Sequence, residues 1–260
     1  MNSGHLHVEE YALIGEFLIQ YLKVIKAYAP NGKQMMTAAQ TLLHIDASAQ
    51  LEERSHTRKL TSSFIERWMS QRPQDRVIRR DIGRSPIPAI DQNWITAAFT
   101  TPEERTSSMV ERLALSDQLV DEVIASDIIV MGAPMYNYGM PTALKGWIDQ
   151  IARIGRTFSF DLGRGDVPIE PILSGKTLVI LSARGEFGFD PGGMRAHMNA
   201  LDPALAACAH YFGVAPEDIH TITIEYQEFK DERYRRSVAQ AEAAVSALAG
   251  QLAAHGRRAA

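Results

Sequence analysis

The sequence has almost no cysteine, and this scarcity excludes two kinds of site. Cys208 is the only thiol among 260 residues, so the chain can form no disulfide within itself and no zinc centre built on several thiolates. A protein without structural disulfides suits a reducing compartment. We therefore expect a cytoplasmic protein, and we expect no metal site.

The chain also has no excess of positive charge. Its 27 lysine and arginine residues stand against 31 aspartate and glutamate residues, which gives a formal net charge of -4 at pH 7. Such a chain has no overall basic field that would attract nucleic acid or an anionic membrane. With 45% hydrophobic and 22% charged residues, it has the composition of an ordinary soluble globular protein. We expect no nucleic-acid partner.

Long apolar runs without charge are missing as well. The most apolar N-terminal run, 11–29, reads YALIGEFLIQYLKVIKAYA and is interrupted by charged side chains, without the basic start or cleavage site of an export signal. It predicts an amphipathic helix within an N-terminal extension of residues 1–40, and no integral membrane span. The helix could pack on a partner subunit or lie on a membrane surface. The stretch could also result from an upstream start, because Met35 and Met36 directly precede the first predicted strand.

An alternation of short β-rich runs and longer helical patterns begins at residue 41. This order is typical of an α/β domain with a doubly wound parallel sheet, and we expect five strands with helices on both faces over residues 41–255. The proline-rich stretch 85–102 predicts a long crossover without regular structure, and 157–174 predicts a β-hairpin or an extended insertion. The predicted strands are 41–46, 76–82, 127–132, 177–182 and 218–224, and the predicted helices are 56–71, 106–125, 141–154, 194–211 and 233–254.

Ligands of doubly wound sheets bind beyond the carboxyl ends of the strands, so the loops after the first, third and fourth strands carry the candidate site. The first loop places Ser48, Ser55 and Thr57 around a helix start. Hydroxyls and free N–H groups at a helix N-terminus form an anion site that suits a phosphate. Serine and threonine at this place could equally serve only as N-caps.

The glycine patterns of other nucleotide sites are missing from these loops. The nearest candidate, 172–177, reads ILSGKT, but Glu170 stands where the first glycine of a Walker motif belongs. The sequence therefore does not favour a P-loop nucleotide enzyme.

The loop after the third strand, 133–141, reads APMYNYGMP and is unusually apolar for a turn. Met135, Tyr136 and Tyr138 could lie against a flat ligand, while Asn137 and the turn at Gly185 could meet its polar edge. The tyrosines could also be core or dimer contacts. A phosphate site beside a site for a flat polar ring indicates a mononucleotide such as FMN.

Longer motifs in the same region resemble a known family. The run PMYNYGMPTALKGWIDQIARIGRTFSF (134–160), the block ALSDQLVDEVIASDIIVMGAPMYN (114–137) and the SARG turn (182–185) resemble the NADH-dependent FMN azoreductases. These are homodimeric flavodoxin-like NAD(P)H:quinone oxidoreductases. The resemblance covers roughly residues 41–250, and the N-terminal extension lies outside it.

The resemblance implies a set of binding residues at matching positions. Two departures fall in the fourth loop, where Glu186 replaces a common glycine and Gly188 replaces a common histidine, and they put the substrate pocket in question. Phe160 matches an aromatic residue presented near the flavin across the dimer interface. The implied FMN contacts are Ser48, Ser55, His56 and Thr57 at the phosphate, Met135, Tyr136, Asn137 and Tyr138 around the ring, and Ala183, Arg184 and Gly185 at the pyrimidine edge; the implied substrate pocket is Asn137, Tyr138 and Phe160.

The resemblance also implies an activity. It is a ping-pong, two-electron transfer from NADH or NADPH through FMN to quinones or azo compounds, with no obligatory acid or base among the side chains. A homodimer acting on small molecules is expected. An NAD(P)H-dependent FMN reductase, a flavodoxin-type electron carrier and a flavin-binding regulatory module remain as alternatives, and the sequence names neither the preferred donor nor the physiological acceptor.

Overall fold

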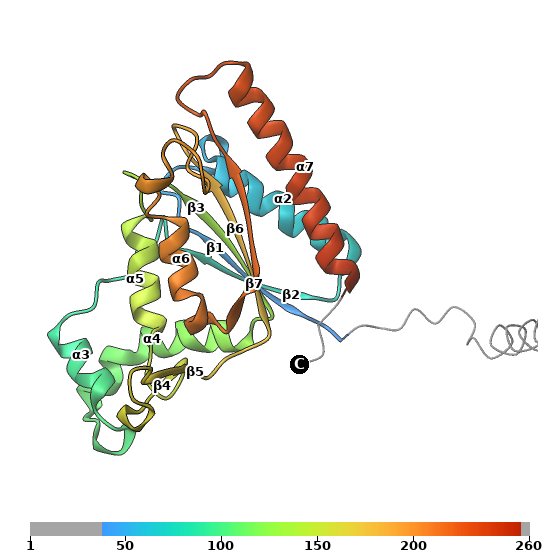
Figure 1. Ribbon diagram of the computed structural model, residues 1–260. Helices are drawn as coiled ribbons and strands as arrows, with labels where there is room; N and C mark the ends of the chain where they lie inside the picture. The colour runs from blue at the N-terminus through green and yellow to red at the C-terminus, as the bar shows by residue number, and fades with distance from the viewer. Residues whose placement is uncertain (1–37, 256–260) are drawn as a thin grey trace, which may run out of the picture. The chain divides into compact units, whose positions relative to one another are not determined.

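A computed structural model describes residues 38–255, and a parallel sheet of five strands forms its centre (Figure 1). The strand order is β2-β1-β3-β6-β7, with every neighbouring pair parallel. This is the flavodoxin-like order, and it confirms the predicted fold class. The N-terminal helix predicted within 1–40 falls almost entirely outside the described residues. The strands of the sheet are β1 (Thr41–Asp46), β2 (Arg76–Asp81), β3 (Ile128–Pro134), β6 (Lys176–Ala183) and β7 (Val214–Ile224).

The central strands are apolar because both of their faces are covered. Every residue of β3 is buried, as expected for the middle strand of a parallel sheet between two helical layers. The helices α2 and α7 cover one face, where Phe64, Trp68 and Val245 share a core. The helices α4, α5 and α6 cover the other face, where Leu119, Trp147 and Leu205 share a second core (Figure 1). The helices are α2 (His56–Gln71), α3 (Gln92–Phe99), α4 (Ser107–Ala125), α5 (Thr142–Ile151), α6 (Asp202–Cys208) and α7 (Glu232–His255).

The crossover 85–102 contains a helix, so the prediction of no regular structure there is wrong. Its prolines lie only at the two ends of the stretch, which leaves the eight residues of α3 free of them. Asp91 caps this helix by accepting a hydrogen bond from the Trp94 N–H at 2.8 Å. The buried side chains of Trp94 and Ala97 pack on Leu113 of α4.

The segment predicted as one helix over 194–211 is broken into three short pieces. These are the 3₁₀ turn Ala196–Met198, the helix α6 and the 3₁₀ turn Ala209–Phe212. Pro203 lies in the first turn of α6. Because proline has no N–H to donate to the preceding turn, α6 begins there as a separate helix. The predicted hairpin is confirmed as the antiparallel pair β4 (Phe158–Phe160) and β5 (Ile169–Pro171). Within residues 38–255, no helix combines the length and apolar character needed to cross a membrane.

Candidate functional site

The loops after β1, β3 and β6 meet at one edge of the sheet. The Tyr136 hydroxyl, from the loop after β3, accepts a hydrogen bond from the Ala49 N–H of the first loop at 3.3 Å. The Tyr138 hydroxyl donates to Oε2 of Glu186, in the loop after β6, at 3.3 Å. Two neighbouring tyrosines thus reach one loop on each side, and the three sequence-predicted loops lie together.

The first loop presents the N-terminus of α2. Oγ of Ser55 accepts a hydrogen bond from the Arg58 N–H at 3.3 Å and lies 3.2 Å from Oγ1 of Thr57. Ser55 is therefore an N-cap, which is the capping role that the sequence left open for these serine and threonine residues. Capping by Ser55 does not use all the N–H groups at this helix end. The first intrahelical hydrogen bond runs from the Lys59 N–H to the Ser55 carbonyl, so the N–H groups of His56 and Thr57 lie before it. These two N–H groups and the positive end of the helix dipole suit an anion.

Ser48 lies beneath this helix end and His56 lies at its rim. Oγ of Ser48 accepts a hydrogen bond from the Gln50 N–H at 3.2 Å. The ring of His56 turns away from the loop, with Nε2 2.8 Å from the Tyr234 hydroxyl of α7. Burial, and next the charge of Lys59, lower the pKa of the His56 imidazole. The His56 side chain is thus a neutral contact to α7, and only its backbone faces the anion position.

The third loop is a tight turn built on an uncommon backbone. Tyr136 and Gly139 exchange both backbone hydrogen bonds, at 2.9 and 3.0 Å, and the two central residues have positive φ, 49° at Asn137 and 68° at Tyr138. This is the pattern of a type I′ turn, which favours asparagine and glycine. A tyrosine in the left-handed region is strained, and such strain gathers at functional sites.

The side chains of this turn are not core residues. Tyr136 is 38% exposed and Tyr138 is 41% exposed, so the alternative that they fill the core is excluded. Met135 packs partly against the core of the α4, α5 and α6 layer, and its N–H donates to the Ala183 carbonyl at 3.0 Å. The Tyr138 ring lies 6.2 Å from the Phe189 ring of the fourth loop. The turn therefore offers two aromatic faces at the junction of the three loops.

The fourth loop is held from behind by the connection between β7 and α7. N–H groups of that connection donate to three successive carbonyls of the turn: Tyr226 to Glu186, Gln227 to Arg184 and Glu228 to Gly185, at 3.1 to 3.2 Å. A Cβ at Gly185 would lie 2.9 Å from Cγ of Glu228, so the turn and this side chain approach closely.

Arg184 supports this turn rather than facing outward. The residue is only 1% exposed, and its guanidinium pairs with Asp202 and lies 3.7 Å from Asp190 Oδ1 and 3.9 Å from Glu225 Oε1. The backbone N–H of Arg184 donates a hydrogen bond to the Ile224 carbonyl at 2.8 Å. Among the predicted pyrimidine-edge contacts, Ala183 ends β6 and its carbonyl accepts from the Met135 N–H, while the carbonyls of Arg184 and Gly185 accept from the β7–α7 connection.

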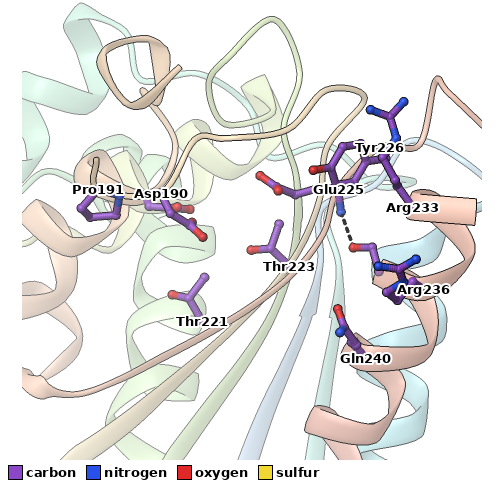
Figure 2. A pocket seen from close by; sticks show the side chains of 11 residues that line it. Asp190, Pro191, Thr221, Thr223, Glu225, Tyr226, Arg233, Arg236 and Gln240 are labelled. Atoms are coloured by element: carbon purple, nitrogen blue, oxygen red, sulfur yellow. Dashed lines mark hydrogen bonds between the residues drawn. The ribbon is translucent and has the colours of Figure 1, made fainter. Parts of the chain in front are cut away.

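A polar cavity lies behind the same loop, between β7 and α7, with a volume of about 650 Å³ (Figure 2). Thr221 and Thr223 of the edge strand line it, together with Gln240 of α7. Burial raises the pKa of the Glu225 carboxyl at its rim. The polar lining does not suit a flat ring, and the cavity stands apart from the aromatic turn. Sequence reasoning gave no signal for it.

Sequence reasoning also missed the contacts that fix Glu186. Oε1 of Glu186 pairs with Arg195 at 2.8 Å, while Oε2 accepts from Tyr138. The guanidinium of Arg195 lies over the Phe187 ring at 4.9 Å. The departure at position 186 thus places a carboxylate beside the aromatic turn, and only the charge of Glu186 itself could have indicated this.

Phe160 is the predicted site residue that the single chain does not bring to the site. It lies on β4, in the hairpin that ends just before the amino end of β6, whereas the three loops lie at the carboxyl ends of the strands (Figure 1). Its side chain is 49% exposed.

Comparisons with known proteins agree with this geometry. Residues 40–248 match the model of a family described by its flavodoxin-like fold. The chain is 49% identical over 218 residues to the FMN-dependent NADH:quinone oxidoreductase 2 of Idiomarina loihiensis, which covers 82% of this chain and 90% of that protein. It is 41% identical over 198 residues to the FMN-dependent NAD(P)H:quinone oxidoreductase 1 of Pseudomonas aeruginosa, covering 76% of this chain and 92% of that protein.

Solved structures share the fold at lower identity. The azoreductase of Bacillus anthracis strain Sterne superposes with a TM-score of 0.73 at 20% identity, covering 82% of this chain and all of the other. An FMN-dependent NADH-azoreductase of Bacillus anthracis, solved in complex with FMN, gives a TM-score of 0.69 at 18% identity and covers 81% of this chain and 99% of its own.

Proposed function

The chain belongs to the flavodoxin-like family of FMN-dependent NADH:quinone oxidoreductases, and from this membership we propose that it transfers two electrons from NADH or NADPH through bound FMN to quinones or azo compounds. The observation that carries the proposal is the meeting of three loops at the carboxyl edge of the sheet, where an anion site at a helix end lies beside two exposed aromatic rings. FMN has one terminal phosphate, which suits the anion site, and one flat ring, which suits the aromatic side chains.

The residues present fit FMN at each of its parts. The N–H groups of His56 and Thr57, with the hydroxyls of Ser48, Ser55 and Thr57, would hold the phosphate. The turn of Met135, Tyr136, Asn137 and Tyr138 would hold the ring. The turn at Gly185 would meet the pyrimidine edge with backbone N–H groups. FMN supplies the hydride chemistry when bound.

The chain's own residues would bind FMN, orient its ring and shield the ring from water. The α2 N-terminus fixes the phosphate end, so the ring is placed by a rigid helix rather than by a mobile loop. Tyr136 and Tyr138 cover apolar ring surface and keep water away from it. The Gly185 turn, braced by the β7–α7 connection, presents dipoles that need no rearrangement when negative charge develops at the ring edge.

We place this activity in a cytoplasmic homodimer. Exposed apolar side chains occur on α3, on α4 and on the β4–β5 hairpin, which lie in the same part of the fold (Figure 1). Exposed apolar side chains on neighbouring elements favour association. We propose that a second copy of the chain covers this surface and that Phe160 of the partner subunit reaches the aromatic turn across the interface, as the family resemblance implies. The exposed side chains are Ile95, Phe99, Val110, Phe160, Leu162 and Val167.

One experiment tests cofactor, donor and turnover together. The purified protein is expected to show a flavin absorbance spectrum or to acquire one with added FMN, and to oxidise NADH or NADPH steadily when a quinone or an azo compound is supplied. FMN that dissociates and is consumed as a substrate would indicate an FMN reductase instead. Bound FMN without oxidation of either nicotinamide would indicate a carrier or a regulatory module, and a protein that binds no FMN would exclude the proposal.

A further inference from the structure

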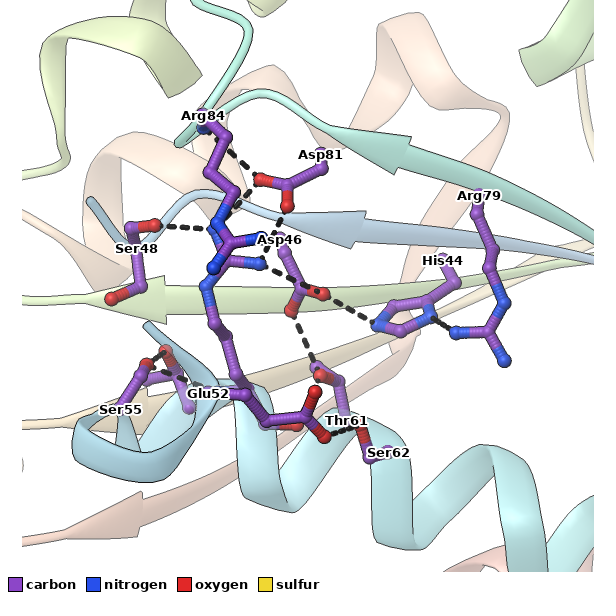
Figure 3. Close-up of polar contacts among 12 residues, drawn as sticks. His44, Asp46, Ser48, Glu52, Ser55, Thr61, Ser62, Arg79, Asp81 and Arg84 are labelled. Carbon is purple, nitrogen blue, oxygen red and sulfur yellow. Dashed lines mark hydrogen bonds and ion pairs between the residues drawn. The ribbon is translucent and has the colours of Figure 1, made fainter. Parts of the chain in front are cut away.

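A network of charged side chains lies directly below the first loop, at the ends of β1 and β2 (Figure 3). Asp46 and Asp81 are the last residues of the two strands and are partners in the parallel register. Two carboxylates at neighbouring strand ends repel each other unless a cation lies between them. Arg58, the third residue of α2, supplies that cation.

The guanidinium of Arg58 is buried, and both of its terminal nitrogens donate hydrogen bonds. It forms a two-pronged pair with Asp81, Nη1 to Oδ2 at 2.8 Å and Nη2 to Oδ1 at 2.6 Å, and Nη1 lies 3.6 Å from Asp46 Oδ2. Arg58 is only 6% exposed. The hydrogen bonds to Asp81 raise the pKa of the Arg58 guanidinium; burial alone would raise the pKa of the Asp81 carboxyl, but the fork from Arg58 lowers it overall. Both groups stay charged across the physiological range.

The same guanidinium also grips the first loop. Nη2 of Arg58 donates to the Ser48 carbonyl at 2.6 Å. A trans peptide is planar, so a carbonyl held inward turns the next N–H outward. That N–H belongs to Ala49, and it donates to the Tyr136 hydroxyl at the junction of the loops. Arg58 therefore sets the orientation of the peptide that links the anion position to the aromatic turn.

The packing leaves this peptide little freedom. A Cβ at Gly83, just after β2, would lie 2.0 Å from the Ser48 carbonyl oxygen and 3.0 Å from Nη2 of Arg58. The Gly83 N–H donates to the Asp46 carbonyl at 2.9 Å, which fixes the β2 end against the loop. The loop is thus held between a glycine on one side and the Arg58 fork on the other.

We propose that Arg58 is the positioning residue of the phosphate loop, and that its fork to Asp81 and Ser48 gives this chain its preference for a flavin with a phosphate over one without. The inference rests on the proposed function. Arg58 acts through geometry, because its charge is paired with Asp81 and Asp46.

The test compares FMN with riboflavin, which has the same ring and no phosphate. Binding of each to the flavin-free protein is followed by quenching of flavin fluorescence. Arg58→Lys keeps the charge but loses the fork, so we expect the ratio of the riboflavin Kd to the FMN Kd to fall about tenfold or more. The double variant Arg58→Ala with Asp81→Asn removes the fork without leaving Asp81 charged, and the same fall is expected.

Arg80→Ala is the matched control. Arg80 lies one residue before Asp81, borders the same network and pairs with Glu122 of α4, Nε to Oε2 at 3.0 Å, without a contact to the first loop. In Arg80→Ala, the ratio of the riboflavin Kd to the FMN Kd should equal that of the unaltered protein. A general loss of folding would weaken both flavins together, so thermal melts accompany each titration.

The inference is overturned if the ratio stays unchanged in folded Arg58→Lys or in the folded double variant, whether or not both flavins bind more weakly. An unaltered chain that binds neither flavin overturns the proposed function itself, and this outcome is recognised before any variant is compared.

Discussion

His56 stands at the first position of α2, where its backbone and its side chain have separate tasks. The backbone N–H faces the anion position, while the ring packs edge-on against Tyr234, with ring centroids 5.6 Å apart. Because burial favours the neutral ring, folding shifts the pKa of the imidazole downward from its ordinary value.

This shift predicts an acid-sensitive contribution to stability. A histidine with a lowered folded pKa binds fewer protons when folded, so its contribution is complete above the unfolded pKa, about 6.5, and is lost as the pH falls below that value toward the folded pKa. Chemical denaturation at a series of pH values should show that His56→Gln is less sensitive over this window than the unaltered protein. His197→Gln, whose side chain is exposed, serves as the control; an equal change in both variants would contradict the assignment.

Glu186 brings a negative charge to the mouth of the candidate site, held by Tyr138 and Arg195. We expect it to disfavour anionic acceptors. Glu186→Gln should raise kcat/KM for a carboxylate-bearing azo compound about two- to fivefold relative to a neutral quinone, the range of a partly exposed charge interaction.

Glu232→Gln gives the matching charge change on α7, where Glu232 is exposed and pairs with Arg235 at 3.0 Å. It should leave the relative kcat/KM of the two acceptors as it was. A uniform change for both acceptors in Glu186→Gln would mean that the carboxylate does not select by charge.

Among the elements, the ends of β1 and β2 and the start of α2 act as one unit. β1 delivers Asp46, β2 delivers Asp81, and α2 returns over both with Arg58 and Thr61, whose hydroxyl donates to Asp46 at 2.8 Å. The helix end that presents N–H groups is therefore attached to the sheet by polar contacts as well as by its apolar face.

Gly83→Ala tests how tightly these elements are joined. The added Cβ meets the Ser48 carbonyl, a backbone atom that cannot move without moving the loop. We expect a loss of about 1–3 kcal/mol in the free energy of unfolding, typical of overpacking, and weaker FMN binding. Gly139→Ala is the control, because nothing lies within 4 Å of its Cβ position. Equal denaturation midpoints for the two variants would contradict the tight contact.

For the whole molecule, the proposed dimer depends on the apolar surface of α3, α4 and the hairpin. We expect the protein to sediment as a dimer. Phe160→Ser, at an exposed position, should shift sedimentation toward the monomer or raise KM for the acceptor several-fold, while the circular dichroism spectrum stays unchanged. Phe229→Ser, at a similarly exposed position beyond β7, is the control for sedimentation alone, because its ring lies 5.7 Å from the Phe187 ring of the fourth loop. A dimer with unaltered kinetics in Phe160→Ser would remove Phe160 from the site.

The sequence by itself determined the alternation of strands and helices, the hairpin and the three loops that meet. These follow from local periodicity and from the rule that ligands lie beyond the carboxyl ends of parallel strands. It failed at α3, where flanking prolines concealed a short capped helix, and at 194–211, where local helix propensity did not reveal the breaks. The tertiary structure alone decided that Arg184 lies beneath its turn, that Glu186 is held by Arg195 and that Arg58 grips the Ser48 carbonyl. The direction of a long polar side chain depends on partners that lie far away along the chain, and only the packing of the strands brings those partners within reach.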